Sequence, residues 1–373
     1  MVVHDRLLQA LKQIDDWIDP AAVSAASVVV RQGGREIGEH HAGTLESGRP
    51  VQRDTIFGLA SVTKPITAAC ALLLVDRGQI GLDEPVARFL PAFGKPSALG
   101  TPEWEAGRGL ITVRQVLSHT SGLPEDLPAD AVPLRNQPTL EQITDAMIAT
   151  PLACQPGTLL RYSNAGYGVL GRLIEAVVGE DIWTFTQKNL LDPMALTGIY
   201  PRPGAEVADH IAPVIDARGK GTAYEPYNSS FWRDLAIPWG GLYGTAADSA
   251  RWAESFLTGD QSPLSGAARQ AMITDQANGV SGGLQMLNLT WHPAFWGLGW
   301  EVKGTKRRHW TGDYTSARTY CHWGAAGTLV WVDPELDLTV AAFGNRTSYN
   351  GWPFAPIARW ARLSNAIVAA VSS

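Results

Sequence analysis

The chain has 373 residues, of which 45% are hydrophobic and 18% are charged, and its formal net charge is −6. This composition is typical of a globular chain that forms one large domain or two closely joined ones. The negative balance argues against a nucleic acid or an anionic membrane as a partner, and no apolar run is long enough to cross a bilayer.

The start of the chain and its cysteines bear on where the protein works. Residues 1–19 carry charges among their leucines and lack the apolar core of a signal peptide, so we expect an amphipathic helix over 7–17. Cys70, Cys154 and Cys321 are too few and too scattered for a disulfide framework or a zinc site. We therefore expect a cytoplasmic protein, with a periplasmic location as the alternative.

The next elements alternate between short strands and a helix. Residues 27–32 and 36–42 predict two strands of a hairpin, because Gly33-Gly34 between them is a turn signal. A strand over 55–59 precedes a helix that ends at Asp76. Proline is tolerated only in the first turn of a helix, so Pro65 requires that helix to begin at about residue 61 or 62.

The middle of the chain reads as mainly helical, with long connections. Thr112 with Gln115 and Thr139 with Gln142 are capping boxes, each of which marks the start of a helix. The loop over residues 201–244 is rich in glycine, proline and aromatic residues, and loops of this length often form binding walls. We expect helices that begin near residue 112 and that cover residues 139–149, 164–178 and 246–257.

The last part of the chain changes to the period-two pattern of strands. Because strands lie at both chain ends, we predict an α+β fold. One antiparallel sheet flanked by helices is formed by residues 1–60 and 286–373, residues 61–285 form an inserted, mainly helical region, and the site lies in the cleft between. The expected C-terminal elements are strands over 296–302, 307–311, 316–322, 328–333 and 338–343 and a helix over 354–371.

The helix start at Ser61-Val62-Thr63-Lys64 is the first candidate for chemistry. Among the lysines, only Lys64 has a serine three residues before it, which places both side chains on one helix face. A serine at a helix N-terminus and a buried, deprotonated lysine can act as nucleophile and base. The tetrapeptide alone is a weak signal that chance can produce.

Tyr162-Ser163-Asn164 is the second candidate, just before a predicted helix. The Tyr162 phenol could relay the proton of Ser61, and the Asn164 amide could orient Lys64 or a substrate carbonyl. The alternative is an ordinary helix cap beside a half-buried tyrosine.

His322-Trp323-Gly324 at the end of a predicted strand is the third candidate. Gly324 would let a substrate approach the backbone, and the N–H of Ala325 with that of Ser61 could form an oxyanion hole. The alternative for His322 is a histidine of the core or surface. The sequence contains no Gly-x-Ser-x-Gly elbow, no His-Glu-x-x-His, no phosphate loop and no dinucleotide fingerprint.

These three motifs stand in the order and rough spacing of the motifs of the serine β-lactamase and penicillin-binding-protein superfamily. The flanking residues 117–123, 240–248 and 297–300 look like the class C β-lactamase branch, with its related carboxylesterases and D-amino-acid peptidases. The resemblance covers about residues 27–346. It implies a β-lactamase/transpeptidase-like fold and a serine hydrolase that works through an acyl-enzyme without metal or cofactor. Ser61 would be acylated while Lys64 and Tyr162 move protons, and which of the two is the base in each step stays open.

One departure from the family pattern points to the substrate. The third motif is usually Lys-Thr-Gly, whereas here it is His322-Trp323-Gly324, which supplies neither a permanent cation nor a hydroxyl for a carboxylate. We therefore expect small uncharged esters or amides as substrates and little β-lactamase activity. Aromatic walls would suit apolar groups, and Trp239 and Trp323 are the preferred candidates among Trp232, Trp239, Trp296, Trp310, Trp323 and Trp352.

Three alternatives remain open from the sequence. The chain could be a D-amino-acid-specific peptidase or amidase, or a β-lactamase. It could pass the acyl group to an alcohol rather than to water. It could also be a non-catalytic binding or scaffold protein with the same fold, although the intact set of Ser61, Lys64 and Tyr162 argues against this.

Overall fold

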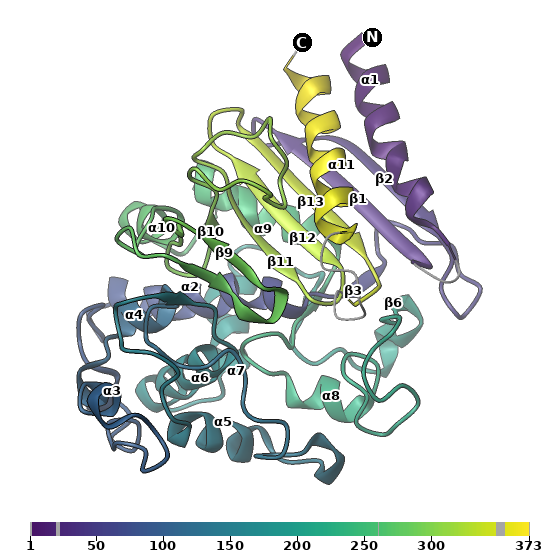
Figure 1. Cartoon of the computed structure of the whole chain (residues 1–373). Helices are drawn as coiled ribbons and strands as arrows, with labels where there is room; N and C mark the ends of the chain where they lie inside the picture. Colours follow the sequence, from purple (N-terminus) through teal and green to yellow (C-terminus); the bar gives the residue numbers. More distant parts are fainter. Residues whose placement is uncertain (1, 20–22, 260, 348–354, 373) are drawn as a thin grey trace.

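The computed structural model describes residues 2–19, 23–259, 261–347 and 355–372. It has a sheet with helices on both faces, to which both chain ends contribute, and a helix-rich region beside it (Figure 1). The predicted α+β class is confirmed. None of the described helices is both long and apolar enough to cross a membrane.

The larger sheet is antiparallel throughout and joins the two ends of the chain. In spatial order its six strands are β10 (Glu301–Val302), β11 (Tyr320–Gly324), β12 (Thr328–Asp333), β13 (Leu338–Gly344), β1 (Ala25–Gln32) and β2 (Arg35–Gly43). Val29 of β1 lies opposite Ala341 of β13. The β1–β2 hairpin turns at Gly33 and Gly34, whose φ angles of 60° and 75° cost glycine little.

Helices cover both faces of this sheet, namely α1 (Val2–Leu11), α9 (Ala246–Thr258) and α11 (Ala355–Val371). The first and last of these lie side by side on one face (Figure 1). Val28 and Val340 belong to the core on that face, whereas Val29 and Ala341 belong to the core that includes α9. Because successive strand residues point to opposite faces, this double cover explains why β12 and β13 are buried at every position.

The remaining helices are α2 (Thr63–Asp76), α3 (Pro102–Glu105), α4 (Val113–Leu117), α5 (Leu140–Ala149), α6 (Asn164–Val178), α7 (Ile182–Thr186), α8 (Ser230–Leu235) and α10 (Gly266–Ile273). Two small sheets have the orders β5 (Ile199–Tyr200), β7 (Tyr243–Gly244), β3 (Ile56–Gly58), β6 (Ile211–Ala212) and β4 (Leu160–Arg161), β8 (Gly282–Leu284), β9 (Leu289–Trp291). Short 3₁₀ helices are η1 (Lys12–Trp17), η2 (Ala60–Val62), η3 (Val86–Arg88), η4 (Arg108–Leu110), η5 (Leu134–Asn136), η7 (Ala205–His210) and η8 (Gln285–Leu287), and η6 (Gln187–Leu191) is a π-helix.

Local signals located the helix starts well. Both predicted capping boxes are present, with the side chain of Thr112 accepting from the Gln115 N–H and that of Thr139 accepting from the Gln142 N–H. α6 has the predicted bounds and is followed by the capping residue Gly179, whose φ is 72°. α2 is buried almost along its whole length.

Two of the expected C-terminal strands are wrong. Of residues 296–302, only Glu301–Val302 form a strand, and Gly299, with a φ of 104°, interrupts the extended chain before it. Residues 307–311 form no strand. The alternation that suggested strands instead reflects the burial of Trp296, Trp300 and Trp310 from irregular segments. The strand expected over 316–322 begins only at Tyr320.

The N-terminal helix also differs from the expectation. It begins at Val2 rather than at residue 7, and it changes to 3₁₀ geometry over Lys12–Trp17. Residue 354, the expected start of the last helix, lies outside the described residues.

Candidate active site

Ser61 lies where the chain passes from β3 into α2. Ala60, directly before it, has a φ of 47°, a left-handed conformation that is uncommon for residues other than glycine. Strained positions of this kind gather at functional sites. Pro65 lies in the first turn of α2, where a missing N–H costs nothing. Ser61 itself is half-buried.

The segment that follows α8 forms hydrogen bonds with the first turns of α2. The Thr67 hydroxyl donates to the Pro238 carbonyl oxygen at 2.6 Å, and the Leu242 N–H donates to the Thr63 hydroxyl at 3.1 Å. These bonds hold the helix turn that carries Ser61 in one position. A nucleophile needs such preorganisation, because small displacements cost large factors in rate.

The amine of Lys64 is the centre of the site. Its Nζ lies 3.0 Å from Ser61 Oγ, 2.7 Å from Asn164 Oδ1 and 2.8 Å from the carbonyl oxygen of Trp239. The lysine is fully buried. The structure therefore brings Ser61, Lys64 and Asn164 together, as the motifs suggested.

The surroundings of Lys64 favour loss of its proton. Burial lowers the pKa of Lys64 to about 7, although the charges of Asp126 and Glu125 act in the opposite direction. Near neutral pH a large share of this amine is therefore uncharged and carries a lone pair. That is the state a general base requires.

Tyr162 is buried next to Lys64 in a group of aromatic rings. The centroid of its ring lies 4.7 Å from Lys64 Nζ. The ring of Trp323 stacks on Tyr162 with centroids 6.1 Å apart and planes 24° apart, and the ring of His119 lies 4.6 Å away. The structure thus places Tyr162 beside the candidate base, and its role in proton relay stays a prediction.

His322 is buried on β11 and uncharged. Its Nδ1 lies 2.9 Å from the carbonyl oxygen of Trp323, which can only accept, so Nδ1 carries the proton. Burial, followed by the charge of Lys64, lowers the pKa of His322 to about 3. That His322 and Trp323 bind the substrate stays a prediction. Their rings pack around Tyr162, and neither is among the described residues that line the cavity beside Ser61.

Gly324 permits a close approach of the protein's own backbone, and its expected role in making room for substrate stays a prediction. A Cβ added there would lie 2.2 Å from Thr328 Oγ1 and 2.3 Å from the carbonyl oxygen of Leu59. The Thr328 hydroxyl donates to the same carbonyl at 2.9 Å. The glycine therefore lets β11 dock against the residues that immediately precede Ser61.

A cavity of about 470 Å³ opens beside Ser61. Ser61, Asn164, Trp239 and Ala325 are the predicted site residues that line it. Since Ser61 and Ala325 face the same cavity, their N–H groups remain the candidates for an oxyanion hole. Much of the remaining wall is apolar and includes Leu127, Val132, Leu134, Ile143, Met147 and Trp232.

The six candidate tryptophans divide into three groups. Trp232 and Trp239 line the cavity, the former from α8 and the latter from the segment between α8 and β7. The stretch 201–244, expected as one long loop, thus contains short elements. Trp352 lies outside the described residues. The other three are buried in the core that contains Tyr162, and they are Trp296, Trp310 and Trp323.

Sequence reasoning missed two acidic residues close to Lys64. Asp126 lines the cavity and accepts a hydrogen bond from Asn164 Nδ2 at 2.8 Å. Glu125 accepts from the Met286 N–H at 3.0 Å, and its backbone carbonyl accepts from the Asn164 N–H at 2.7 Å. Both follow directly after the Ser-His-Thr-Ser-Gly-Leu-Pro segment that resembled the family, which is the signal that could have drawn attention to them.

His119 of that same segment was also missed. It is buried, its Nδ1 accepts from the Ser163 N–H at 3.0 Å, and its φ is 59°. Burial and the charge of Lys64 lower its pKa well below the usual value. His119 therefore helps to hold the Tyr162-Ser163-Asn164 turn in place as an uncharged group.

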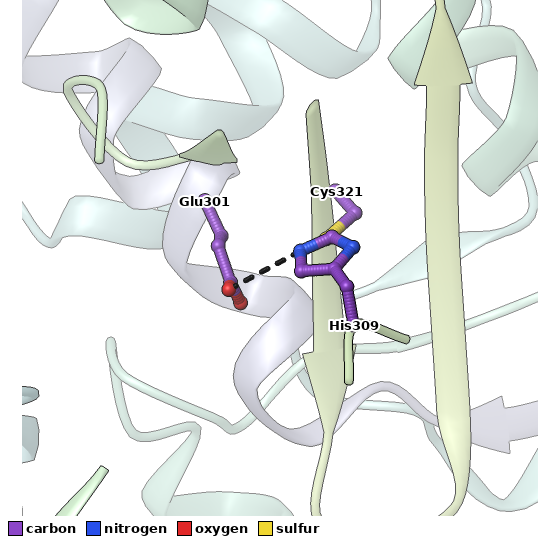
Figure 2. Close-up of side chains that lie close together, drawn as sticks. All are labelled: Glu301, His309 and Cys321. Carbon is purple, nitrogen blue, oxygen red and sulfur yellow. Dashed lines mark hydrogen bonds and ion pairs between the residues drawn. The ribbon is translucent and has the colours of Figure 1, made fainter. Parts of the chain in front are cut away.

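A second buried polar cluster lies on the sheet side of the molecule, and Figure 2 shows its three side chains of metal-binding types: Glu301, His309 and Cys321. Their ligand-type atoms lie within 4.8 Å of one another, although the sequence spacing gave no sign of such a group. His309 Nε2 lies 3.3 Å from Glu301 Oε1 and 3.9 Å from Cys321 Sγ.

The donor set of this cluster is already engaged by protein groups. Lys306 Nζ lies 2.8 Å from Glu301 Oε1, and Trp310 Nε1 donates to Glu301 Oε2 at 2.9 Å. Burial acts to raise the pKa of Glu301, but the Lys306 charge and His309 together lower it to about 2. Burial also raises the pKa of the Cys321 thiol well above its usual value. The cluster is thus organised as an internal ion-paired network rather than as an open metal site.

Comparison with known proteins identifies the family of this chain and several of its relatives. Residues 9–362 match the family described as Beta-lactamase. The chain is 30% identical to Esterase EstB of Burkholderia gladioli over 373 aligned residues, which cover 88% of this chain and 87% of EstB. It is 31% identical to Penicillin-binding protein 4 of Amycolatopsis lactamdurans, over 77% of this chain and 70% of that protein.

The fold comparison agrees. The crystal structure of a penicillin-binding protein homologue from Caulobacter crescentus matches with a TM-score of 0.78 and 21% identity, over 99% of this chain and 97% of the other. At this identity the likeness concerns the fold.

Proposed function

Because the chain belongs to the Beta-lactamase family and is a serine hydrolase, we propose that Ser61 is its nucleophile and that uncharged esters are its preferred substrates. The observation that carries this proposal is the hydrogen-bonded contact between Ser61 and a buried lysine whose pKa is lowered to about 7.

The first step is acylation of Ser61. Uncharged Lys64 takes the proton of Ser61 as its Oγ attacks the substrate carbonyl, and the N–H groups of Ser61 and Ala325 stabilise the tetrahedral oxyanion. Tyr162, next to Lys64, gives its proton to the oxygen of the leaving alcohol and takes up the proton that Lys64 holds, so both groups return to their starting states. Water then attacks the carbonyl of the Ser61 ester and loses a proton to Lys64. Lys64 returns this proton to Ser61 Oγ as the acid leaves, which restores the free enzyme.

Two observations support an uncharged substrate. The wall of the cavity beside Ser61 is largely apolar, which suits an apolar acyl or aryl group. His322 stands where the family usually has a lysine, and it is uncharged and does not face the cavity. The third motif therefore offers no cation to a substrate carboxylate. Esterase EstB, a relative of this chain along most of its length, agrees with this choice.

A second candidate is hydrolysis of peptides or lactams that carry a carboxylate. Arg135 and Arg218 line the cavity and could bind such a group. Penicillin-binding protein 4 is also a relative. Both arginines are exposed, so a carboxylate bound to them would remain hydrated, which weakens this candidate.

A panel of substrates run with wild type and Ser61→Ala separates the candidates. We expect short-chain p-nitrophenyl esters to be hydrolysed faster than nitrocefin or D-alanyl-D-alanine peptides, and we expect Ser61→Ala to abolish all turnover. Faster turnover of the lactam or the peptide would favour the second candidate. Ester hydrolysis at the wild-type rate in Ser61→Ala would refute the assignment of Ser61.

A further inference from the structure

Asp126 lies in the loop that follows α4 and lines the cavity, and its side chain contacts Asn164 rather than Lys64 directly. Asn164 Nδ2 donates to Asp126 Oδ1 at 2.8 Å, while Asn164 Oδ1 accepts from Lys64 Nζ at 2.7 Å. A continuous chain of hydrogen bonds therefore runs from Asp126 through Asn164 and Lys64 to Ser61.

The carboxylate determines which way the amide of Asn164 faces. An ionised carboxylate only accepts hydrogen bonds, so the NH₂ group of Asn164 must point to Asp126. The carbonyl oxygen of the same amide then points to Lys64. Without this acceptor, the NH₂ group could turn toward Lys64, where it would compete with the amine as a donor.

The amide orientation in turn determines where the lone pair of Lys64 points. An uncharged lysine amine has two protons and one lone pair. Asn164 Oδ1 and the carbonyl oxygen of Trp239 both accept, at 2.7 and 2.8 Å, and neither can donate. The two protons are used there, so the lone pair is left for the third neighbour, Ser61 Oγ at 3.0 Å.

We propose that Asp126 is a positioning residue for acylation: it fixes the amide of Asn164 so that the lone pair of uncharged Lys64 faces Ser61. This inference rests on the proposed function, in which Lys64 takes the proton of Ser61. In this role Asp126 controls which atom receives the lone pair of Lys64, and it does not itself contact the reacting atoms.

The charge of Asp126 adds a second effect. Its carboxylate and that of Glu125 both act to raise the pKa of Lys64. Loss of either charge therefore lowers that pKa further and extends activity to lower pH. Among the described residues, the ionisable groups that face Lys64 or Asp126 are Asp126, Glu125, His119, His322, Tyr162, Tyr167, Tyr227 and Arg218.

Three variants separate orientation from charge. Asp126→Ala removes both the acceptor and the charge. Asp126→Asn removes the charge, but its side-chain carbonyl can still accept from Asn164. Glu125→Gln is the matched control, since it removes a charge near Lys64 while the Glu125 side chain bonds to the Met286 N–H and not to the Asn164 amide.

The readouts are the pH profile of kcat/KM for a p-nitrophenyl ester and the pH profile of Ser61 labelling by a fluorophosphonate probe. Asp126→Ala should lower the plateau by about tenfold or more, as expected for loss of a hydrogen bond to a charged group. Asp126→Asn should keep most of the plateau. In all three variants the acid limb should move to lower pH. If Asp126→Ala does not fold, Asp126→Leu, which fills the space without an acceptor, takes its place.

The results that would overturn the role of Asp126 differ from the results that would overturn the proposed function. A wild-type plateau in Asp126→Ala, or an equal loss in Asp126→Asn and Asp126→Ala, would overturn the positioning role while ester hydrolysis by wild type stands. Wild type that is labelled at Ser61 but does not hydrolyse esters would overturn the proposed substrate. The labelling profiles of the variants would then still decide the role of Asp126.

Discussion

Three lysines are buried among the described residues, and two of them, Lys64 and Lys306, have partners that differ in charge. In the helix-rich region, the three close partners of Lys64 are the neutral oxygens of Ser61, Asn164 and Trp239. On the sheet side, Lys306 Nζ lies 2.8 Å from a carboxylate oxygen of Glu301. An adjacent carboxylate favours the charged form of a lysine, whereas burial among neutral groups favours the uncharged form.

This difference separates a lysine suited to chemistry from one suited to structure. Lys64 has a pKa of about 7 and contacts a serine that faces a cavity. Lys306 belongs to a network in which Glu301 also contacts Trp310 and His309, and this network holds irregular segments against β10. Burial alone would not tell the two apart, since both ammonium groups are inaccessible.

The largest expected effect is on activity when Lys64 is replaced. Lys64→Met should reduce kcat/KM for esters by about 10⁴-fold or more, because the nucleophile loses its base. The free energy of unfolding should be unchanged or higher, since an amine is no longer buried. Ester kinetics together with urea unfolding measure both. A destabilised variant that keeps its activity would reverse the roles assigned to the two lysines.

Replacement of Lys306 should have the opposite signature. Lys306→Met leaves the Glu301 carboxylate without its ammonium partner, which should lower the free energy of unfolding by about 3–5 kcal/mol. Activity per folded molecule should stay within a few-fold of wild type. Adding Glu301→Gln should recover part of the lost stability, and a double variant as unstable as the single one would contradict the ion-pair explanation.

The titration of Lys64 predicts an acid limb in the pH profile. Below its pKa of about 7 the amine is protonated and has no lone pair, so kcat/KM should fall with decreasing pH and be lower by about 100-fold at pH 5. The pKa of His322, about 3, lies outside this range. His322→Gln should therefore leave the acid limb at the same pH. A limb that moves in this variant would show that Lys64 is not the group that titrates.

A smaller effect is expected from the glycine that docks β11 beside Ser61. Gly324→Ala places a Cβ 2.3 Å from the Leu59 carbonyl oxygen, so the backbone before Ser61 must shift. We expect kcat/KM to fall by about tenfold. Gly344→Ala, on strand β13 of the same sheet, is the control, because its nearest contact would be an ordinary 3.5 Å. Equal losses in both variants would contradict this explanation.

Much of the helical framework could be predicted because its signals are local. The capping boxes at Thr112 and Thr139 and the glycine after α6 depend only on nearby residues, and the structure has them. The strand predictions were weaker between residues 296 and 319, where a period-two pattern arose from tryptophans buried by irregular chain. Periodicity reports burial, and burial does not require a strand.

In the candidate site too, contacts between residues close in sequence could be predicted, whereas contacts between distant segments could not. Ser61 and Lys64 share one helix turn, and their contact follows from the spacing of three residues. The Asp126 contact with Asn164 joins a loop to the first residue of α6, 38 residues further along the chain, and no short-range signal predicts it. The inward orientation of His322 and Trp323 depends on the aromatic packing around Tyr162, which the motif alone does not encode.

The most direct test of the account is to label the nucleophile covalently and locate the modified residue. The protein is incubated with a fluorophosphonate probe at pH 8, digested and analysed by mass spectrometry, with Ser61→Ala and Lys64→Met alongside. The account predicts a single adduct on Ser61, none in Ser61→Ala and greatly slowed labelling in Lys64→Met. Equal labelling of Lys64→Met, or an adduct on another residue, would contradict the claim that an uncharged Lys64 activates Ser61.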